Sequence, residues 1–358
     1  MWVTSYELLR QDIERYAPLR FACCILDEAQ HIKNQSTLVS KAVKRIDCPQ
    51  RFILTGTPIE NRLSELWNLF DFLMPGYVFS HSAFVQKLEK PAIKSRSEEA
   101  MTKLQRMVQP FLLRRMKKEV LKELPPKIEY VRRISLSEDE RKVYFAASAA
   151  AKNSLTAGDN GKMAVFAALT ELRQICCAPG LRFENYAGPS SKLDACIELC
   201  AGMAENGHQI LLFSQFTSML DLIRARLDEL GITHFTLQGS TPKEKRAQLV
   251  KAFNAGEASV FLISLKAGGT GLNLTAADTV ILYDPWWNPA AQDQAVDRAH
   301  RIGQRSSVQV YKLIAKDTIE EKILKLQSQK AALLDAVTAS GESSILDMSK
   351  EELLALFE

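Results

Sequence analysis

The chain has 358 residues, of which 46% are hydrophobic and 25% are charged, and its formal net charge is +4. This composition excludes a disordered chain, and this length predicts two domains rather than one. A net charge this small excludes a uniformly basic surface, so any contact with nucleic acid requires a local patch. No stretch reaches the ~18 apolar residues of a membrane span, and the seven cysteines include no Cys-x-x-Cys pair, which favours buried thiols.

The first part of the chain alternates predicted strands and helices. Trp2–Tyr6 has the pattern of a strand, and a helix is expected over 7–16. The unbroken apolar run Phe21–Leu26 is typical of a strand that is buried on both faces. The next segments predict a polar helix over 36–45, a strand over 51–54 and an amphipathic helix over 63–73. This spacing indicates a parallel strand–helix–strand unit.

A helical region and a proline pair separate the first part from the second. Residues 80–125 are expected to be helical and increasingly basic, and Pro125–Pro126 marks the predicted boundary. Helices interrupted by a loop at Gly158–Gly161 are expected over 137–178. The basic residues near the end of the first part are Arg114, Arg115, Lys117 and Lys118. Such a run is either a nucleic-acid contact or a solvated surface.

From Ser191 onward a second alternating set begins. Strands are predicted over 209–214, 234–238, 259–264, 279–284 and 308–314. Helices are predicted over 218–229, 242–254, 289–302 and 318–337. Strands that alternate with helices of this length predict an α/β fold with a doubly wound parallel sheet.

Two polar segments follow the predicted strands of the first part. Asp27 and Glu28 end the first strand, where open α/β sheets bind ligands. One carboxylate can hold Mg²⁺ while its neighbour orients a water for phosphoryl transfer; the alternative is a pair of solvated acids. Thr55, Gly56 and Thr57 follow the second strand. They are typical either of a loop that senses a γ-phosphate or of a tight turn with a helix cap.

The second part carries a glycine loop and an arginine pair. Ser264–Asn273 follows a strand and has three glycines in four residues, which lets its backbone approach a phosphate closely. Gln294, Arg298 and Arg301 are spaced to share one face of a predicted helix. Arginines in this position can stabilise charge in phosphoryl transfer, whereas a solvated charged face is the alternative.

Together these stretches resemble the SWI/SNF-type ATPases, a branch of the superfamily-two helicases. The matching segments are Asp27–Gln30, Leu54–Asn61, Phe111–Lys117, Ile210–Phe216, Gly268–Leu274, Asp284–Pro289 and Gln294–Gln304. The resemblance implies two RecA-like lobes with ATP between them and duplex DNA across both. In this scheme residues 1–125 form the C-terminal part of lobe 1 with a helical insertion. The expected domains that follow are a linker and helical segment over 126–190, lobe 2 over 191–340 and a tail over 341–358.

The resemblance also implies roles for individual residues. Asp27 would hold Mg²⁺, Glu28 would activate the attacking water, and Arg298 and Arg301 would be arginine fingers. Residues expected near the nucleotide are Gln30, Thr55, Gly56, Thr57, Gly269, Gly271 and Gln294. Residues expected near the DNA backbone or the lobe interface are Ser264, Lys266, Thr270 and Asn273, with Trp286 and Trp287 either against DNA or in the core.

One family motif is missing from the sequence. The glycine-rich loop with a lysine that cradles the phosphates is expected before Trp2–Tyr6, which resembles the motif that follows it. Gly158–Met163 and Gly268–Gly271 lack the spacing or the lysine to replace it, whereas Ser349–Phe357 resembles the usual family ending. The resemblance therefore implies an N-terminally truncated ATPase, and we expect the chain alone to bind and hydrolyse ATP weakly.

The expected function is that of an ATP-dependent translocase that moves on double-stranded DNA and remodels a bound nucleoprotein. DNA contact would be with phosphates, independent of sequence, and no membrane is involved. The alternative is a non-catalytic nucleic-acid-binding or scaffold module. An RNA helicase is disfavoured, because the acidic motif ends in Gln30 rather than Asp or His. The expected location is the cytoplasm beside the nucleoid in a bacterium, or the nucleus in a eukaryote.

Overall fold

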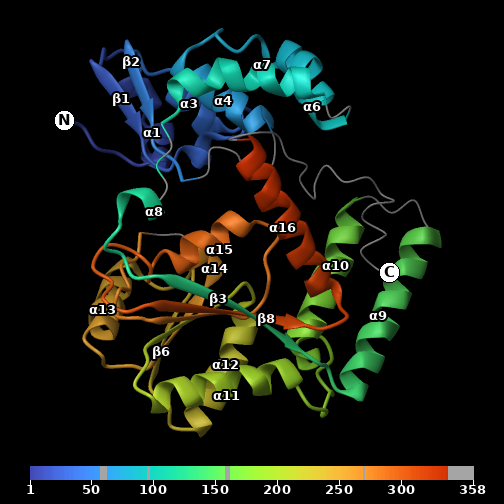
Figure 1. The fold of residues 1–358 in the computed structure, drawn as a ribbon. Coiled ribbons are helices and arrows are strands. Elements are labelled where there is room, and N and C mark those ends of the chain that lie inside the picture. Colours follow the sequence, from blue (N-terminus) through green and yellow to red (C-terminus); the bar gives the residue numbers. More distant parts are fainter. Residues whose placement is uncertain are drawn as a thin grey trace. The chain divides into compact units, whose positions relative to one another are not determined.

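The computed structural model describes residues 1–56, 63–94, 97–113, 115, 117–157, 162–268 and 271–337. Contacts divide the chain into two compact units, whose main parts are Met1–Arg114 (unit 1) and Arg115–Ser328 (unit 2) (Figure 1). The predicted loop at 158–161 and the predicted tail over 341–358 lie outside the described residues. Among the described helices, none is long and apolar enough to cross a membrane.

Unit 1 contains the predicted parallel strand–helix–strand unit. Strand β1 (Cys23–Leu26) pairs in parallel with β2 (Gln50–Ile53), and α3 (Leu38–Lys44) connects them. Thr37 caps α3, because its side chain accepts a hydrogen bond from the Ser40 amide. The other elements are α1 (Tyr6–Gln11), α2 (Ile13–Tyr16), η1 (Ala29–Ile32), α4 (Leu63–Leu73), α5 (His81–Phe84), η2 (Val85–Glu89), α6 (Lys90–Lys94), α7 (Glu98–Val108) and η3 (Gln109–Phe111).

The prediction that the first strand is buried on both faces is wrong. Leu26 packs into a core with residues of α1, α3 and α4, but Ile25 on the opposite face is 62% exposed. Phe52 and Leu54 are also exposed, on and just after the neighbouring strand. Among the described residues the sheet has two strands, and the helices cover only one of its faces. The apolar run therefore fits a strand, but not a doubly covered one.

The predicted strand over Trp2–Tyr6 is also wrong. Tyr6 already belongs to α1, and the Ser5 side chain caps this helix by accepting a hydrogen bond from the Leu8 amide at 3.2 Å. Trp2 and Val3 are largely exposed and lie in no regular element. Serine before a helical turn favours a helix start, because it satisfies a free N–H that a strand would have to pair elsewhere. The amphipathic helix predicted over 63–73 is confirmed as α4.

Over its described residues, unit 2 is built on a parallel sheet of six strands in the order β3-β8-β7-β4-β6-β5. The strands are β3 (Lys127–Ile134), β4 (Ile210–Ser214), β5 (His234–Leu237), β6 (Val260–Ser264), β7 (Thr279–Leu282) and β8 (Val308–Ala315). The helices are α8 (Lys117–Val120), α9 (Glu138–Ala157), α10 (Lys162–Cys177), η4 (Pro179–Leu181), α11 (Ser191–Glu205), α12 (Thr217–Glu229), α13 (Lys243–Asn254), α14 (Leu265–Gly268), α15 (Pro289–Val296) and α16 (Ile319–Val337). The five strands predicted from 209 onward are confirmed, and so is the α/β fold.

Helices cover both faces of this sheet, as expected for a doubly wound fold. Alternate strand residues point to opposite sides: Leu212 packs with α11 and α12, whereas its neighbour Phe213 packs with α13 and α15. Figure 1 shows α11 and α12 on one side and α14 and α15 on the other. β4, β6 and β7 are buried throughout, which accounts for their continuous apolar sequences.

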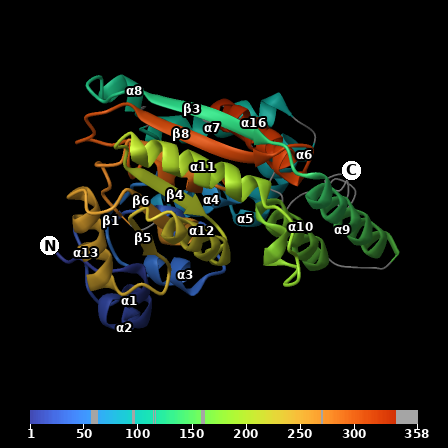
Figure 2. The ribbon, with the colours of Figure 1, turned by 90° about the horizontal axis from the view of Figure 1, so that it is seen from below.

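Strand β3 was missed by the sequence prediction, which placed residues 126–190 in a linker and helical segment. It pairs with β8 in parallel from Lys127 to Ile134 and forms one edge of the sheet. Figures 1 and 2 both show it beside β8. Most of its side chains are exposed, so it lacks the apolar run or alternation that reveals a strand.

Candidate functional site

The two adjacent carboxylates lie where β1 ends. Glu28 has a left-handed backbone with φ of 48°, and its N–H donates to Asp27 Oδ1 at 3.0 Å. A non-glycine residue in this conformation costs of order 1 kcal/mol, so the neighbouring contacts must maintain it. Both side chains are exposed. The strand therefore ends in a sharp turn that presents two carboxylates to solvent.

A short chain of hydrogen bonds links the acidic segment to the loop after β2. Gln30 donates from Nε2 to Glu28 Oε2 at 2.7 Å, and it accepts at Oε1 from Thr55 Oγ1 at 2.9 Å. The backbone adds a second link, because the Ala29 amide donates to the Leu54 carbonyl at 3.1 Å. The structure therefore brings Glu28, Gln30 and Thr55 together. Gly56 follows directly, and Thr57 lies outside the described residues.

Tyr6 supports this turn from α1, although its sequence context gave no signal of such a role. Its hydroxyl donates to the backbone carbonyl of Asp27 at 2.7 Å. Burial, and then the nearby charge of Asp27, raise the pKa of Tyr6 well above the ordinary value for tyrosine. The hydroxyl therefore keeps its proton and remains a donor at all physiological pH values.

Asp27 is chemically suited to a magnesium–nucleotide complex. One of its oxygens accepts from Glu28 N–H, and the other has no hydrogen-bond partner among the described residues. Within those residues no three His, Cys, Asp or Glu side chains gather into a metal site. Mg²⁺ characteristically takes one or two protein carboxylates and completes its shell with phosphate oxygens and water. The residues present fit a Mg²⁺ ion carried in with a nucleotide, with Asp27 as its protein ligand.

The predicted glycine loop begins with one turn of helix. β6 ends at Ser264, and α14 starts at Leu265. Ser264 is 5% exposed, and its hydroxyl accepts from the Ala267 amide at 3.4 Å, so it supports this turn from inside. Lys266, Gly271 and Asn273 are exposed, and Gly269 and Thr270 lie outside the described residues. The backbone carbonyl of Asn273 accepts from Asn254 Nδ2 at 2.8 Å, which ties the loop to α13.

The prediction that Gln294, Arg298 and Arg301 share one helix face is wrong. Helix α15 ends at Val296, so the half-buried Gln294 is on the helix and the two arginines follow it in turns. The carbonyl of Arg298 accepts from the Leu274 amide at 3.0 Å, and Arg301 Nη1 donates to the Leu272 carbonyl at 3.3 Å. The first bond uses the backbone of Arg298, and the second uses the side chain of Arg301. The arginines are therefore placed against the end of the glycine loop.

The turn segment after α15 also captures a basic side chain from the start of unit 2. Lys117 Nζ lies 2.5 Å from Asp297 Oδ1 and donates to the His300 carbonyl at 3.2 Å. His300 Nε2 lies 2.8 Å from the Pro125 carbonyl. Lys117 thus bonds to two residues, Asp297 and His300, of the segment that carries Arg298 and Arg301. Arg114 and the side chain of Lys118 lie outside the described residues, and Arg115 is exposed.

The two adjacent tryptophans have different environments. Trp286 packs against the sheet core, and its amide donates to Gln292 Oε1 at 3.4 Å. Its carbonyl accepts from Gln327 of α16, which also donates to Gln292. Trp287 is half-buried and makes no hydrogen bond among the described residues. Trp286 is therefore anchored by hydrogen bonds, whereas Trp287 has none among the described residues. The anchoring glutamines had no recognisable sequence signal.

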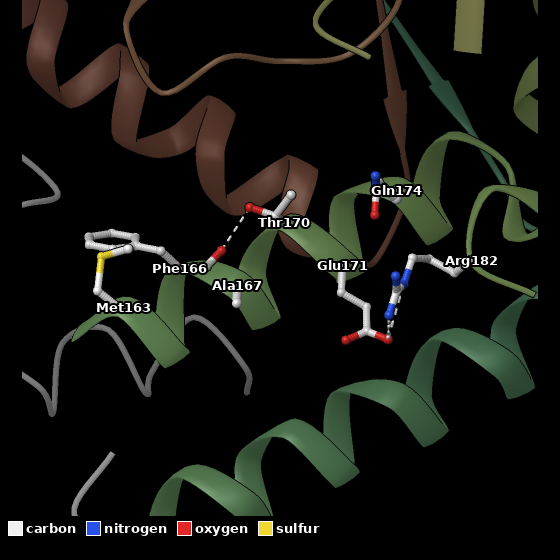
Figure 3. A pocket seen from close by; sticks show the side chains of 7 residues that line it. All are labelled: Met163, Phe166, Ala167, Thr170, Glu171, Gln174 and Arg182. Carbon is white, nitrogen blue, oxygen red and sulfur yellow. Dashed lines mark hydrogen bonds and ion pairs between the residues drawn. The ribbon is translucent and has the colours of Figure 1, made fainter. Parts of the chain in front are cut away.

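A separate pocket of about 480 Å³ lies on the outer face of α10. Figure 3 shows its seven lining residues, which are Met163, Phe166, Ala167, Thr170, Glu171, Gln174 and Arg182. Glu171 and Arg182 form an ion pair at 3.1 Å, and Thr170 donates to the Phe166 carbonyl within its own helix. None of the predicted site residues lines this pocket, so we do not assign it to the candidate site.

Comparisons with known proteins identify the family of this chain. The family model of the SNF2-related domain matches residues 1–181, and that of the helicase conserved C-terminal domain matches residues 191–303. The chain is 39% identical to an uncharacterized ATP-dependent helicase of Mycoplasma genitalium and 40% identical to the putative ATP-dependent helicase/translocase YwqA of Bacillus subtilis. Both matches cover 99% of the chain but only 34% and 40% of the relatives, so it spans roughly a third of their length.

Solved structures give the same result. The SWI2/SNF2 ATPase core of Sulfolobus solfataricus, solved in complex with double-stranded DNA, is 35% identical with a TM-score of 0.54. That match covers 97% of this chain and 75% of the Sulfolobus chain. A second structure of the Sulfolobus core domain gives a TM-score of 0.55 at 35% identity. The chain therefore belongs to the SNF2 family, the SWI/SNF-type ATP-dependent helicases.

Proposed function

We propose that this chain is the motor portion of an enzyme that hydrolyses ATP to move along duplex DNA and to remodel protein bound there. The observation that carries the proposal is the hydrogen-bonded chain from Glu28 through Gln30 to Thr55. A solvated strand end has no need for a side chain from a neighbouring loop to fix the orientation of its carboxylate. A catalytic carboxylate does, because proton transfer requires a defined direction.

Asp27 and the three hydrogen-bonded residues Glu28, Gln30 and Thr55 then each have a separate task. Bound Mg²⁺ would supply charge neutralisation at the β- and γ-phosphates, with Asp27 as its protein ligand. Glu28 accepts a proton from the attacking water, and Gln30 holds the Glu28 carboxylate in place. Thr55 connects this carboxylate to the loop after β2, so that loss of the γ-phosphate changes the position of both segments.

The arginines of unit 2 complete the proposed chemistry. Arg298 and Arg301 would stabilise the negative charge on the transferring phosphoryl group. Their attachment to Leu272 and Leu274 joins them to the glycine-loop segment. A change at the nucleotide would therefore move the arginines and that segment together.

The same segment supports the proposed DNA contact. Lys266 and Asn273 are exposed on either side of the glycines, and Trp287 is half-buried. A lysine and an amide suit phosphate oxygens, which carry no sequence information. Ser264 is buried and acts through the turn that it supports. The Sulfolobus core, a relative at 35% identity, was solved with double-stranded DNA, which favours duplex DNA as the partner here.

A non-catalytic module derived from such a motor is the second candidate. The 358 residues contain no glycine-rich loop followed by Lys-Ser or Lys-Thr. Such a loop supplies the phosphate cradle of ATPases of this kind. We therefore propose that the 358-residue chain alone hydrolyses ATP slowly.

The two candidates separate in one experiment. The first protein is the chain alone. The second, the loop-completed chain, has a segment with a Gly-x-Gly-Lys-Thr-type loop joined ahead of Met1. ATP turnover is measured for both, with and without duplex DNA. A motor predicts slow turnover by the chain alone and DNA-stimulated turnover by the loop-completed chain. Duplex binding without turnover by either protein would favour the non-catalytic module.

A further inference from the structure

One arginine is completely buried in unit 2 and bonds to the segment that precedes the tryptophans. Arg173 lies on the inner face of α10 and is 1% exposed. Its Nη2 donates to Asp284 Oδ2 at 3.2 Å and to the Pro285 carbonyl at 2.8 Å. Burying a guanidinium costs free energy unless hydrogen bonds and an opposite charge compensate for the lost water, so the contacts of Arg173 are needed to keep it in place.

Three aromatic rings surround the same cation. The guanidinium carbon of Arg173 lies 5.2 Å from the ring centre of Phe216, 5.2 Å from that of Trp286 and 5.8 Å from that of Trp287. Cations within about 6 Å of an aromatic ring are attracted to it, and the attraction is stronger where water is excluded. The planar guanidinium can contact several rings at once, which a lysine ammonium does less well.

Asp284 connects this cluster to the sheet. Its Oδ1 accepts from Ser214 Oγ at 2.6 Å and from the Gln215 amide at 3.1 Å, while its Oδ2 accepts from Arg173. Asp284 is 3% exposed. The carboxylate therefore joins the end of β4, the segment after β7 and helix α10 through directed bonds.

The two tryptophans depend on Arg173 to different extents. Trp286 is held independently by Gln292, Gln327 and the sheet core. Trp287 has no such hydrogen bonds among the described residues, and the Arg173 cation lies beside its ring. Loss of Arg173 should therefore release Trp287 more than Trp286.

We propose that Arg173 is a positioning residue, which holds Trp287 in the orientation that contacts duplex DNA. The inference rests on the proposed binding of duplex DNA and adds to it a residue on α10, more than a hundred positions before the tryptophans in sequence. Arg173 itself touches no DNA. Its effect on binding passes through the ring of Trp287.

The test measures the affinity of the 358-residue chain for a short fluorescent duplex by anisotropy. The variants are Arg173→Met, Trp287→Ala, the double variant and Arg182→Met, a control on the exposed ion pair just beyond the same helix. We expect Arg173→Met and Trp287→Ala each to weaken binding about tenfold. The double variant should be no weaker than Trp287→Ala, and Arg182→Met should match the unsubstituted chain within about twofold.

Several outcomes would overturn the inference, and each is distinguishable. Duplex binding by the unsubstituted chain with no loss in Arg173→Met removes the positioning role but leaves the proposed function standing. Fully additive losses in the double variant show that Arg173 acts independently of Trp287, which also contradicts it. No duplex binding by the unsubstituted chain removes both proposals.

A folding defect in Arg173→Met does not end the test. Arg173→Lys keeps the charge beside Asp284 but loses the planar contact with the rings. We expect its circular dichroism melt to match that of the unsubstituted chain and its duplex affinity to fall by about threefold. Unchanged affinity in Arg173→Lys, together with unchanged quenching of tryptophan emission on adding DNA, would contradict the positioning role.

Discussion

Lys192 and Glu320 form an ion pair that is completely buried in unit 2, and it provides a sharp test of how the unit is held together. Both side chains are 0% exposed, and Lys192 Nζ lies 2.6 Å from each carboxylate oxygen. Glu320 Oε2 also accepts from the Ala315 amide at 2.8 Å, and Nζ lies 5.0 Å from the ring centre of Tyr283. The pair therefore joins the start of α11, the end of β8 and the start of α16.

Replacing Lys192 by methionine keeps most of the volume but leaves Glu320 with a backbone N–H as its remaining donor. Breaking a buried pair in this way costs about 3–5 kcal/mol of unfolding free energy, because an uncompensated charge stays buried. Burial already raises the pKa of Glu320, and Lys192 opposes that rise. In Lys192→Met the carboxyl should therefore take up a proton more readily, so the loss of stability should shrink as the pH falls. Lys192→Met/Glu320→Leu should recover part of the loss, because no unpaired charge remains.

Urea unfolding of the full chain measures this effect if the signal comes from unit 2. In a Trp2→Phe/Trp67→Phe background the remaining tryptophans, Trp286 and Trp287, report on unit 2 alone. Lys192→Met should lower the unfolding free energy by about 3 kcal/mol or more at neutral pH. A loss below about 1 kcal/mol, or a double variant less stable than the single one, would show that the pair does not hold these elements together.

Three further predictions concern single side chains. Burial acts to raise the pKa of Glu129, but its two lysine partners outweigh burial and lower the pKa to about 2. The stability from this carboxylate is therefore present above pH 4.5 and lost as the pH falls toward 2, and Glu129→Gln should abolish that loss in acid unfolding curves. The effect should be only about 1 kcal/mol, because a third of the side chain faces water. Gln30→Ala should lower kcat of the loop-completed chain about tenfold with a smaller change in KM, which steady-state kinetics would show. Ser5→Ala removes the cap of α1 and should destabilise unit 1 by about 1 kcal/mol in urea, measured through Trp67.

The sheet of unit 2 was predictable because its central strands β4, β6 and β7 are buried on both faces. Ile210–Ser214 and Val260–Ser264 are continuous apolar runs, and runs of that kind between helices define a doubly wound sheet. β3 could not be predicted in the same way, because an exposed edge strand has no such run. Its pairing with β8 depends on backbone bonds between residues about 180 positions apart.

Helix ends and strand faces depended on long-range contacts that a local pattern does not contain. The periodicity of Gln294, Arg298 and Arg301 suggested one helix, but α15 ends at Val296, and the two arginines bond to Leu272 and Leu274 instead. The apolar run before Asp27 was consistent with burial on both faces. Its outer face is nevertheless uncovered, which no property of the run itself reveals.

Part of the candidate site was predictable, because the carboxyl ends of the parallel strands β1 and β2 lie at the same edge of their sheet. That rule brought the acidic pair and the segment at Thr55 together, and the structure adds Gln30 as the side chain that joins them. Tyr6 and Arg173 were missed because they act from distant helices through a single hydroxyl and a single guanidinium. Neither residue stands in a local pattern that differs from an ordinary helix.

The proposed role of Glu28 as a catalytic base, held in place by Gln30, can be tested by removing its charge. ATP turnover under single-turnover conditions and nucleotide affinity are measured for the loop-completed chain with duplex DNA, and for its Glu28→Gln variant. The matched control is Glu14→Gln, a change at an exposed acid of unit 1 that pairs with Arg45. Glu28→Gln should reduce turnover about a hundredfold or more while ATP affinity stays within about threefold, and Glu14→Gln should change neither. Turnover in Glu28→Gln equal to that of the control would contradict the claim.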